Sequence, residues 1–150
     1  MKKKIAIIGS GIAGLALASL LKINSNFEFV VYEKEDILNL DESFGIQLSV
    51  NSVSILNKIG FSQLNKNEKY HPSKLDFYSI NYNKICDLDL ATFNSTDNKY
   101  TTLKRSILIK FLKEKLFSNS ILFRKKINDV KKIKIGDFYA IIKILYLTKN

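Results

Sequence analysis

The first part of the chain alternates between short apolar runs and a glycine-rich interruption. Lys4–Ile8 (KIAII) is rich in β-branched residues, as is typical of a buried parallel strand. The sequence GSGIAG follows at residues 9–14, and small and apolar residues continue to Leu21. A second β-branched and aromatic run covers Phe27–Tyr32. The pattern therefore predicts strand, helix (12–21) and strand, a single βαβ unit.

Three patterned segments follow. Ser52–Gly60 has apolar residues spaced approximately as one face of a helix, and Gly60 marks its end. That apolar face consists of Val53, Ile55, Leu56 and Ile59. Leu75–Ile80 and Ile85–Leu90 flank a polar turn of about four residues, which predicts a β-hairpin. Thr101–Leu112 is typical of a short strand that leads into a helix.

The last patterned segment is unusual. Ile127–Ile135 alternates as a strand does, Gly136-Asp137 predicts a turn, and Phe138–Leu147 is apolar except for Lys143. This run is too short for a membrane helix, which needs about 20 residues. Two interpretations remain: a buried central strand that needs further residues to cover it, or out-of-frame sequence that follows a deletion.

Composition and charge limit the classes of function that we expect for this chain. With 150 residues, of which 46% are hydrophobic, the chain suits one compact domain over residues 1–150. The net charge of +10 is compatible with nucleic-acid binding. However, the only arginines are Arg105 and Arg124, and the lysines are spread along the chain. Because recognition of bases and phosphates favours arginine, we do not expect nucleic-acid binding.

The single cysteine, Cys86, excludes an internal disulfide and fits a reducing cytoplasm. Together with the single histidine, His71, it cannot form a zinc cluster, so no metal site is expected. Cys86 fits a small strand residue and His71 a loop residue beside Pro72. No residue stands out as catalytic.

The basic, apolar start also resembles a secretion signal, with Ala16-Leu17-Ala18 as a cleavage-like site. Against this, the glycines at positions 9 and 11 divide the apolar run, and each weakens a helix by about 1 kcal/mol. The run is also marginal in length for a membrane span. We therefore expect neither a signal nor an integral membrane segment.

A nucleotide-binding turn accounts for each residue of the GSGIAG segment. Gly9 would make the tight turn, Gly11 would admit a pyrophosphate, and Gly14 would pack the helix against the sheet. The helix N-terminus presents N–H groups to phosphates. Glu33, at the end of the second strand, would accept hydrogen bonds from a ribose and repel a 2′-phosphate, which argues against NADP in this site. The candidate cofactor residues here are Gly9, Ser10, Gly11, Ile12, Ala13, Gly14 and Glu33.

Two downstream segments carry a resemblance to a known family. Phe44–Asn51 and the helix up to Gly60 resemble the G-x-x-L-x-P-N-A, helix, L-G pattern of the class A flavoprotein monooxygenases, the p-hydroxybenzoate and salicylate hydroxylase-like enzymes. Val50 stands where that family usually has proline, which should soften the helix start. Arg105, Leu108 and Leu112 match the family's R-x-x-L-x-x-x-L.

The resemblance implies further site residues. In the family, the residue equivalent to Arg105 contacts FAD, whose pyrophosphate would compensate a cation in the first turn of a helix. A solvated surface arginine is the alternative. Lys34 matches a basic position near the adenosine phosphates, and Gln47 belongs to the segment that approaches the flavin. Residues 72–100 would contribute strands on the substrate side.

The family resemblance implies a fold and a reaction. The fold is α/β, a Rossmann-like FAD-binding βαβ unit with an inserted antiparallel hairpin, and the cofactors are FAD and NAD(P)H. NAD(P)H reduces the flavin, and oxygen then hydroxylates an aromatic substrate. The match covers roughly Lys4 to Arg124, and the family's mid-chain Asp-Gly segment and later Gly-Asp motif are missing; Gly136-Asp137 is interpreted as a turn and not as that motif. We therefore expect a truncated or split member, completed by a separately encoded C-terminal half or inactive alone. An NAD-binding oxidoreductase domain and an inactive remnant or binding module remain alternatives.

Overall fold

The chain forms two compact units, each with its own sheet and helices. The computed structural model describes residues 2–40, 44–135 and 138–144, with side chains as far as Asp129. One unit contains the chain up to Asn39 and again from Leu112, and the other contains Leu40–Phe111. The predicted dinucleotide turn lies in the first unit, and the predicted hairpin lies in the second.

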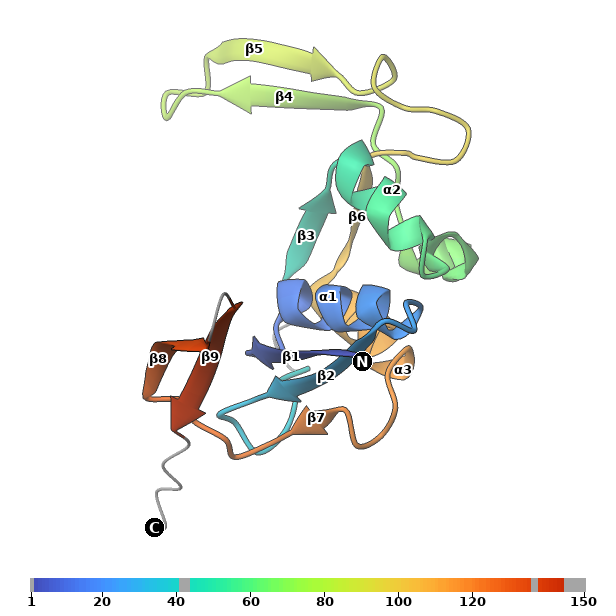
Figure 1. Ribbon diagram of the computed structural model, residues 1–150. Helices are drawn as coiled ribbons and strands as arrows, with labels where there is room; N and C mark the ends of the chain where they lie inside the picture. Colours follow the sequence, from blue (N-terminus) through green and yellow to red (C-terminus); the bar gives the residue numbers. More distant parts are fainter. Residues whose placement is uncertain (1, 41–43, 136–137, 145–150) are drawn as a thin grey trace. The chain divides into compact units, whose positions relative to one another are not determined.

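The first unit contains the predicted βαβ arrangement, which is confirmed. β1 (Lys3–Ile8) and β2 (Phe27–Tyr32) are parallel and are joined through α1 (Ile12–Lys22) (Figure 1). The sequence did not indicate β7 (Ile121–Leu122), which pairs in parallel with the other edge of β2. The sheet order is therefore β1-β2-β7.

β1 is parallel as expected, but the expectation that it is buried is wrong. Ile7 is buried, whereas Ile8 is 57% exposed. The strand lies at an edge of its sheet, so only one of its sides has a neighbour among the described strands. The core of this unit forms instead where Leu15 and Ala18 of α1 and Val31 of β2 are fully buried.

The second unit is built on an antiparallel pair, β3 (Gly45–Leu48) and β6 (Thr101–Lys104). β3 leads into α2 (Val50–Asn57), and β6 leads into α3 (Arg105–Glu114). Two short 3-10 turns, η1 (Phe61–Gln63) and η2 (Lys66–Glu68), follow α2.

α2 begins at Val50, two residues before the predicted start, although proline is absent there. Ser49 caps the helix, because its side chain accepts a hydrogen bond from the Ser52 N–H. Of the four expected apolar positions, Val53, Leu56 and Ile59 are buried, but Ile55 is 47% exposed. The buried positions recur every three residues, which turns Ile55 away from the core. Gly60 ends the segment with φ +88°, a conformation that favours glycine.

The predicted hairpin is confirmed with slightly shifted bounds. β4 (Lys74–Tyr78) pairs antiparallel with β5 (Lys84–Asp89), and Ser79 N–H donates to Asn83 O across the turn at 2.8 Å. The expected strand ends Ser79, Ile80 and Leu90 lie outside the two strands. Tyr82 has φ +61° in the turn.

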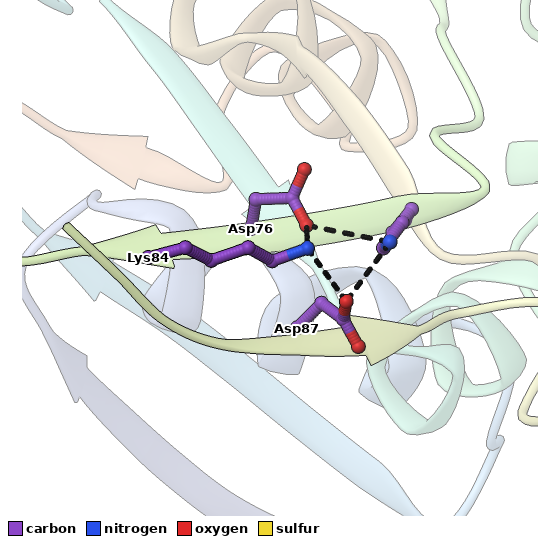
Figure 2. Close-up of polar contacts among 4 residues, drawn as sticks. Asp76, Lys84 and Asp87 are labelled. Atoms are coloured by element: carbon purple, nitrogen blue, oxygen red, sulfur yellow. Dashed lines mark hydrogen bonds and ion pairs between the residues drawn. The ribbon is translucent and has the colours of Figure 1, made fainter. Parts of the chain in front are cut away.

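The hairpin has one charged face and one apolar face. Lys84 Nζ lies 2.8 Å from Asp76 and 2.6 Å from Asp87, and Lys74 also pairs with both carboxylates (Figure 2). Hydrogen bonds and charge from the two lysines lower the pKa of Asp87 to about 2. Residues alternate between faces along a strand, so the cross-strand pairs Leu75–Leu88 and Phe77–Cys86 share the opposite face.

The strand predicted over residues 127–135 is confirmed from Asp129 onward. The apolar run contains a second strand, which among the described strands pairs with this one alone and so is not central in a sheet. β8 (Asp129–Ile135) and β9 (Phe138–Ile144) pair antiparallel. Asp129 lies opposite Ile144 at one end of the pair, and Ile135 lies opposite Phe138 at the other. The predicted Gly136-Asp137 turn and the end of the apolar run at residues 145–147 lie outside the described residues. Within the described ranges, no helix combines the length and apolar character that crossing a membrane requires.

Candidate nucleotide-binding site

The glycine-rich turn begins where β1 ends. Gly9 has φ +94°, a conformation that L-residues rarely adopt. Its N–H donates to Tyr32 O at 2.8 Å, so the end of β1 stays joined to the end of β2 as the chain turns into α1. The turn therefore lies at the carboxyl ends of two parallel strands, where ligands bind in open α/β sheets.

Gly14 allows α1 to pass close to this turn. A Cβ built on Gly14 would overlap Gly9 O and would lie 3.2 Å from Gly9 C and 3.3 Å from Ile7 Cγ2. Two of these three neighbours are main-chain atoms, which cannot move aside as a flexible side chain can. The packing role expected for Gly14 is thus visible in the structure.

Gly11 is in a different environment. It is exposed, and a Cβ added there would meet no atom within 4 Å. Gly11 is the N-cap of α1, and no side chain caps this helix end. The first turn of a helix leaves N–H groups without intrahelical partners, so the N–H groups at Ile12 and Ala13 are suited to an anion. The site has both the space and the donors that a pyrophosphate needs.

Glu33 lies beside this turn, held by Ser10. The Ser10 N–H donates to Glu33 Oε2 at 2.7 Å, and the Ser10 hydroxyl donates to the same oxygen at 2.5 Å. The Glu35 N–H donates to Glu33 Oε1 at 3.1 Å. A carboxylate has about four lone-pair positions, so acceptor capacity remains for a ligand. The sequence identified both Ser10 and Glu33, but nothing in it indicated that they bind each other.

The main chain of Glu33 is fixed by a segment distant in sequence. Glu33 N–H donates to Leu122 O at 2.9 Å, and Lys125 N–H donates to Glu33 O at 2.7 Å. β7 and the residues after it therefore hold the end of β2. Lys34, which follows Glu33, is exposed and forms an ion pair with Glu35 at 3.3 Å.

These contacts set the ionisation of Glu33. Partial burial alone would raise the pKa of the Glu33 carboxyl, but hydrogen bonds from Ser10, Glu35 and Lys34 lower it below the ordinary 4.5. The site therefore holds the charged carboxylate, which accepts hydrogen bonds from hydroxyl groups.

This lowered pKa predicts a pH dependence of stability. Because the folded chain binds the Glu33 proton more weakly than the unfolded chain, the stabilisation is fully present above about pH 4.5. It is lost as the pH falls through the lower, folded pKa. Urea unfolding of the wild type and of Glu33→Gln should differ most near pH 6, and the difference should shrink as the pH falls through the lowered pKa of Glu33. A difference that stays constant with pH would contradict this ionisation.

The two other candidate residues lie in the second unit, on neighbouring strand and helix. Gln47 is exposed on β3, where its Oε1 accepts a hydrogen bond from the Tyr100 hydroxyl at 2.8 Å. Arg105 is the first residue of α3, its N–H donates to Phe44 O at 3.0 Å, and its guanidinium carbon lies 5.7 Å from the centre of the Phe44 ring. Arg105 is half-buried, so it is not a fully solvated surface arginine.

The chain is similar in sequence to a known domain family and to two known enzymes. Residues 7–40 match the NAD(P)-binding Rossmann-like domain family. The 3-amino-4-hydroxybenzoate 2-monooxygenase PtnB3 of Streptomyces platensis is 41% identical over 61 residues, which is 41% of this chain and 15% of that enzyme. A second 3-amino-4-hydroxybenzoate 2-monooxygenase of the same organism, PtmB3, is 39% identical over 61 residues.

The solved structures extend the likeness beyond this segment. HpxO of Klebsiella pneumoniae, complexed with FAD and uric acid, superposes with a TM-score of 0.68 at 19% identity, covering 94% of this chain and 35% of HpxO. The 2-methyl-3-hydroxypyridine-5-carboxylic acid oxygenase superposes with a TM-score of 0.65 at 19% identity, covering 84% of this chain and 32% of the oxygenase. The chain thus spans about a third of the length of each structure.

These findings agree with the architecture predicted from the sequence. The fold is α/β and Rossmann-like with an antiparallel hairpin after α2, and most of the chain superposes on the two solved structures. The 61-residue match to the curated enzymes adds likeness at the level of sequence. The resemblance to the N-terminal part of the class A flavoprotein monooxygenases is thus confirmed, in sequence over 61 residues and in fold over most of the chain.

Proposed function

We propose that this chain binds FAD as the N-terminal portion of a flavoprotein monooxygenase, which hydroxylates an aromatic or related small molecule with NAD(P)H and O2. The observation that carries this proposal is the pairing of Ser10 with Glu33 beside the uncapped N-terminus of α1. It brings a carboxylate for a ribose and main-chain donors for a pyrophosphate to the same edge of the sheet.

Within this proposal each candidate residue has a role. Gly9 and Gly14 shape the turn, and the main chain from Ser10 to Ala13 faces the pyrophosphate. Glu33 accepts hydrogen bonds from the adenosine ribose, and its negative charge disfavours a 2′-phosphate. Lys34 lies near the adenosine phosphates, whereas Gln47 and Arg105 serve the flavin side. When bound, FAD supplies the redox chemistry, and the protein supplies binding and orientation.

An NAD-binding oxidoreductase domain is the alternative that uses the same turn. Such a domain would continue with further βα units after α2. Here α2 is followed by two 3-10 turns and an antiparallel hairpin instead. The sequence relatives are 3-amino-4-hydroxybenzoate 2-monooxygenases, and the superposed HpxO structure contains FAD, which supports FAD over NAD as the bound dinucleotide.

We further propose that hydroxylation requires more polypeptide than this chain supplies. The solved relatives are about three times as long as the part that superposes. An enclosed flavin needs contacts from several segments, and an open site admits water. A separately encoded polypeptide with the family's Asp-Gly and Gly-Asp motifs is the proposed partner; without it, the chain would act as a binding module or remnant. The single cysteine supports a reducing, cytoplasmic location for both.

The test is the visible spectrum of the purified chain after incubation with FAD and removal of excess by gel filtration. Retained flavin, displaced poorly by NAD+, is the expected result. A folded chain that retains no flavin would refute the FAD proposal, and efficient displacement by NAD+ would favour the alternative. Aromatic hydroxylation by the purified chain alone would contradict the need for further polypeptide.

Arg105 provides a separate prediction. Arg105→Ala should weaken FAD binding about tenfold, because a charge-assisted hydrogen bond contributes roughly 1.5–3 kcal/mol. Lys104→Ala removes an exposed cation from the preceding position and is the matched control. Titration by flavin fluorescence would measure both. Equal affinities for the two variants would indicate that Arg105 contributes only general positive charge.

A further inference from the structure

The second unit contains a cavity that the nucleotide site does not use. Its volume is about 400 Å³, within the range of pockets that hold small molecules. Val53, Phe61 and Thr101 are lining residues that are buried. Lys69, His71 and Lys99 also line the cavity and are less buried than those three residues. The lining thus combines two apolar side chains, Val53 and Phe61, with basic ones.

Lys69 is the most informative of these residues. Its Nζ donates to Ser62 O at 3.1 Å and to Phe61 O at 3.4 Å and lies 5.4 Å from the centre of the Phe61 ring. Among the described residues, no carboxylate pairs with it. Partial burial and the nearby Lys66 lower the pKa of Lys69. An ammonium that is partly desolvated and lacks a counter-charge favours an anion beside it.

Lys99 and Asp97 provide the other charges on the cavity wall. Both are exposed, and neither forms an ion pair with another described residue. The two lysines outweigh the single carboxylate, so the wall is cationic when His71 is neutral.

The hydrogen bonds of His71 define which of its nitrogens carries the proton. Nδ1 lies 3.2 Å from Tyr100 O and 3.1 Å from Thr101 Oγ1. The Thr101 hydroxyl donates its own proton to Lys99 O at 2.7 Å, so both neighbours of Nδ1 are acceptors. Nδ1 must therefore donate, and Nε2 of the neutral ring has no proton. At neutral His71, Lys69 and Lys99 are therefore the cationic side chains that line the cavity.

We propose that this cavity binds a small organic carboxylate with an apolar body. The carboxylate would be paired with Lys69 and Lys99, and the apolar body would contact Val53 and Phe61. The site goes beyond the proposed FAD function, because all of its residues lie within Leu40–Phe111 and none belongs to the dinucleotide turn.

The test is an NMR titration of the 15N-labelled full chain, without FAD, using hexanoate as the probe. Hexanoate should shift the amide NMR signals of the residues around the cavity, and the shifts should saturate as its concentration rises. Inorganic phosphate has charge without an apolar body, and hexanol has the body without charge. Each should bind at least tenfold more weakly than hexanoate. If phosphate bound as tightly as hexanoate, the proposed contact of the apolar body with Val53 and Phe61 would be wrong. If hexanol bound as tightly as hexanoate, the proposed contact of the carboxylate with the lysines would be wrong.

Variants locate the site. Lys69→Met and Lys99→Met should each weaken hexanoate binding at least fivefold, whereas Lys110→Met, at an exposed position of α3, should leave it unchanged. Lys69→Arg keeps the charge and should retain binding if Lys69→Met fails to fold. Equal weakening by Lys110→Met, or no saturable shift at the cavity, would overturn the proposal. The hexanoate titration contains no FAD. A negative titration would therefore refute only the carboxylate site, and the visible spectrum would still test the FAD proposal separately.

Discussion

Replacing Gly14 with alanine is expected to destabilise the chain and to remove FAD binding. The new Cβ would overlap Gly9 O and approach Gly9 C, both of them main-chain atoms. α1 can then keep its place only if the β1–α1 turn shifts. Overpacking of this kind costs about 1–3 kcal/mol, and the shifted turn would no longer present its N–H groups correctly. Urea unfolding measures the first effect, and flavin retention measures the second.

Gly11→Ala is the matched control for Gly14→Ala. The substitution is the same and lies three positions earlier, but the added Cβ meets no protein atom within 4 Å. The free energy of unfolding should therefore fall less than in Gly14→Ala, because the expected loss is that of a better N-cap residue, about 1 kcal/mol or less. FAD binding should still weaken, because the methyl group would occupy the space proposed for the pyrophosphate. If Gly11→Ala binds FAD as the wild type does, the pyrophosphate does not approach Gly11.

Glu33→Ala should weaken FAD binding by at least tenfold. Hydrogen bonds to a charged group contribute roughly 1.5–3 kcal/mol each, and the proposed ribose contact is lost entirely. The substitution also releases the Ser10 N–H and hydroxyl from their shared acceptor, so the turn keeps only its main-chain bond from Gly9 to Tyr32 as a link to the end of β2. Titration of each variant by flavin fluorescence provides the affinities.

Two further variants distinguish the specific contacts of Glu33 from a general effect of net charge. Glu35→Ala removes a nearby exposed carboxylate and breaks its ion pair with Lys34, but it leaves the Glu35 N–H that donates to Glu33. It should bind FAD within about twofold of the wild type, because exposed ion pairs contribute little. Ser10→Ala removes only the hydroxyl contact and should lie between the other two variants. If Glu35→Ala weakens binding as much as Glu33→Ala, the effect is one of net charge and Glu33 has no specific role.

The local elements followed from short-range patterns. The β-branched runs and the glycine spacing identified β1, α1 and β2, and the turn between two alternating segments identified the β4–β5 hairpin. These features depend on backbone preferences and on side-chain periodicity, both of which a sequence displays directly. The same spacing indicated that Gly14 lets the helix pack against the sheet.

Other features depended on segments that meet only in the folded chain. The two-residue strand β7 is too short to show a period, yet it completes the sheet and fixes the main chain of Glu33. The exposure of β1 follows from its position at a sheet edge, and sheet order cannot be derived from the strand's own residues.

For the two sites as well, the sequence determined some features and the tertiary structure determined others. The sequence alone determined that a carboxylate follows β2 and that glycines follow β1, because these positions are local. Only the tertiary structure decided that Ser10 binds Glu33 across 23 positions of sequence. It also decided that Lys69, His71 and Lys99 line one cavity. Such pairings arise from chain segments brought together by burial and hydrogen bonding, and no local preference encodes them.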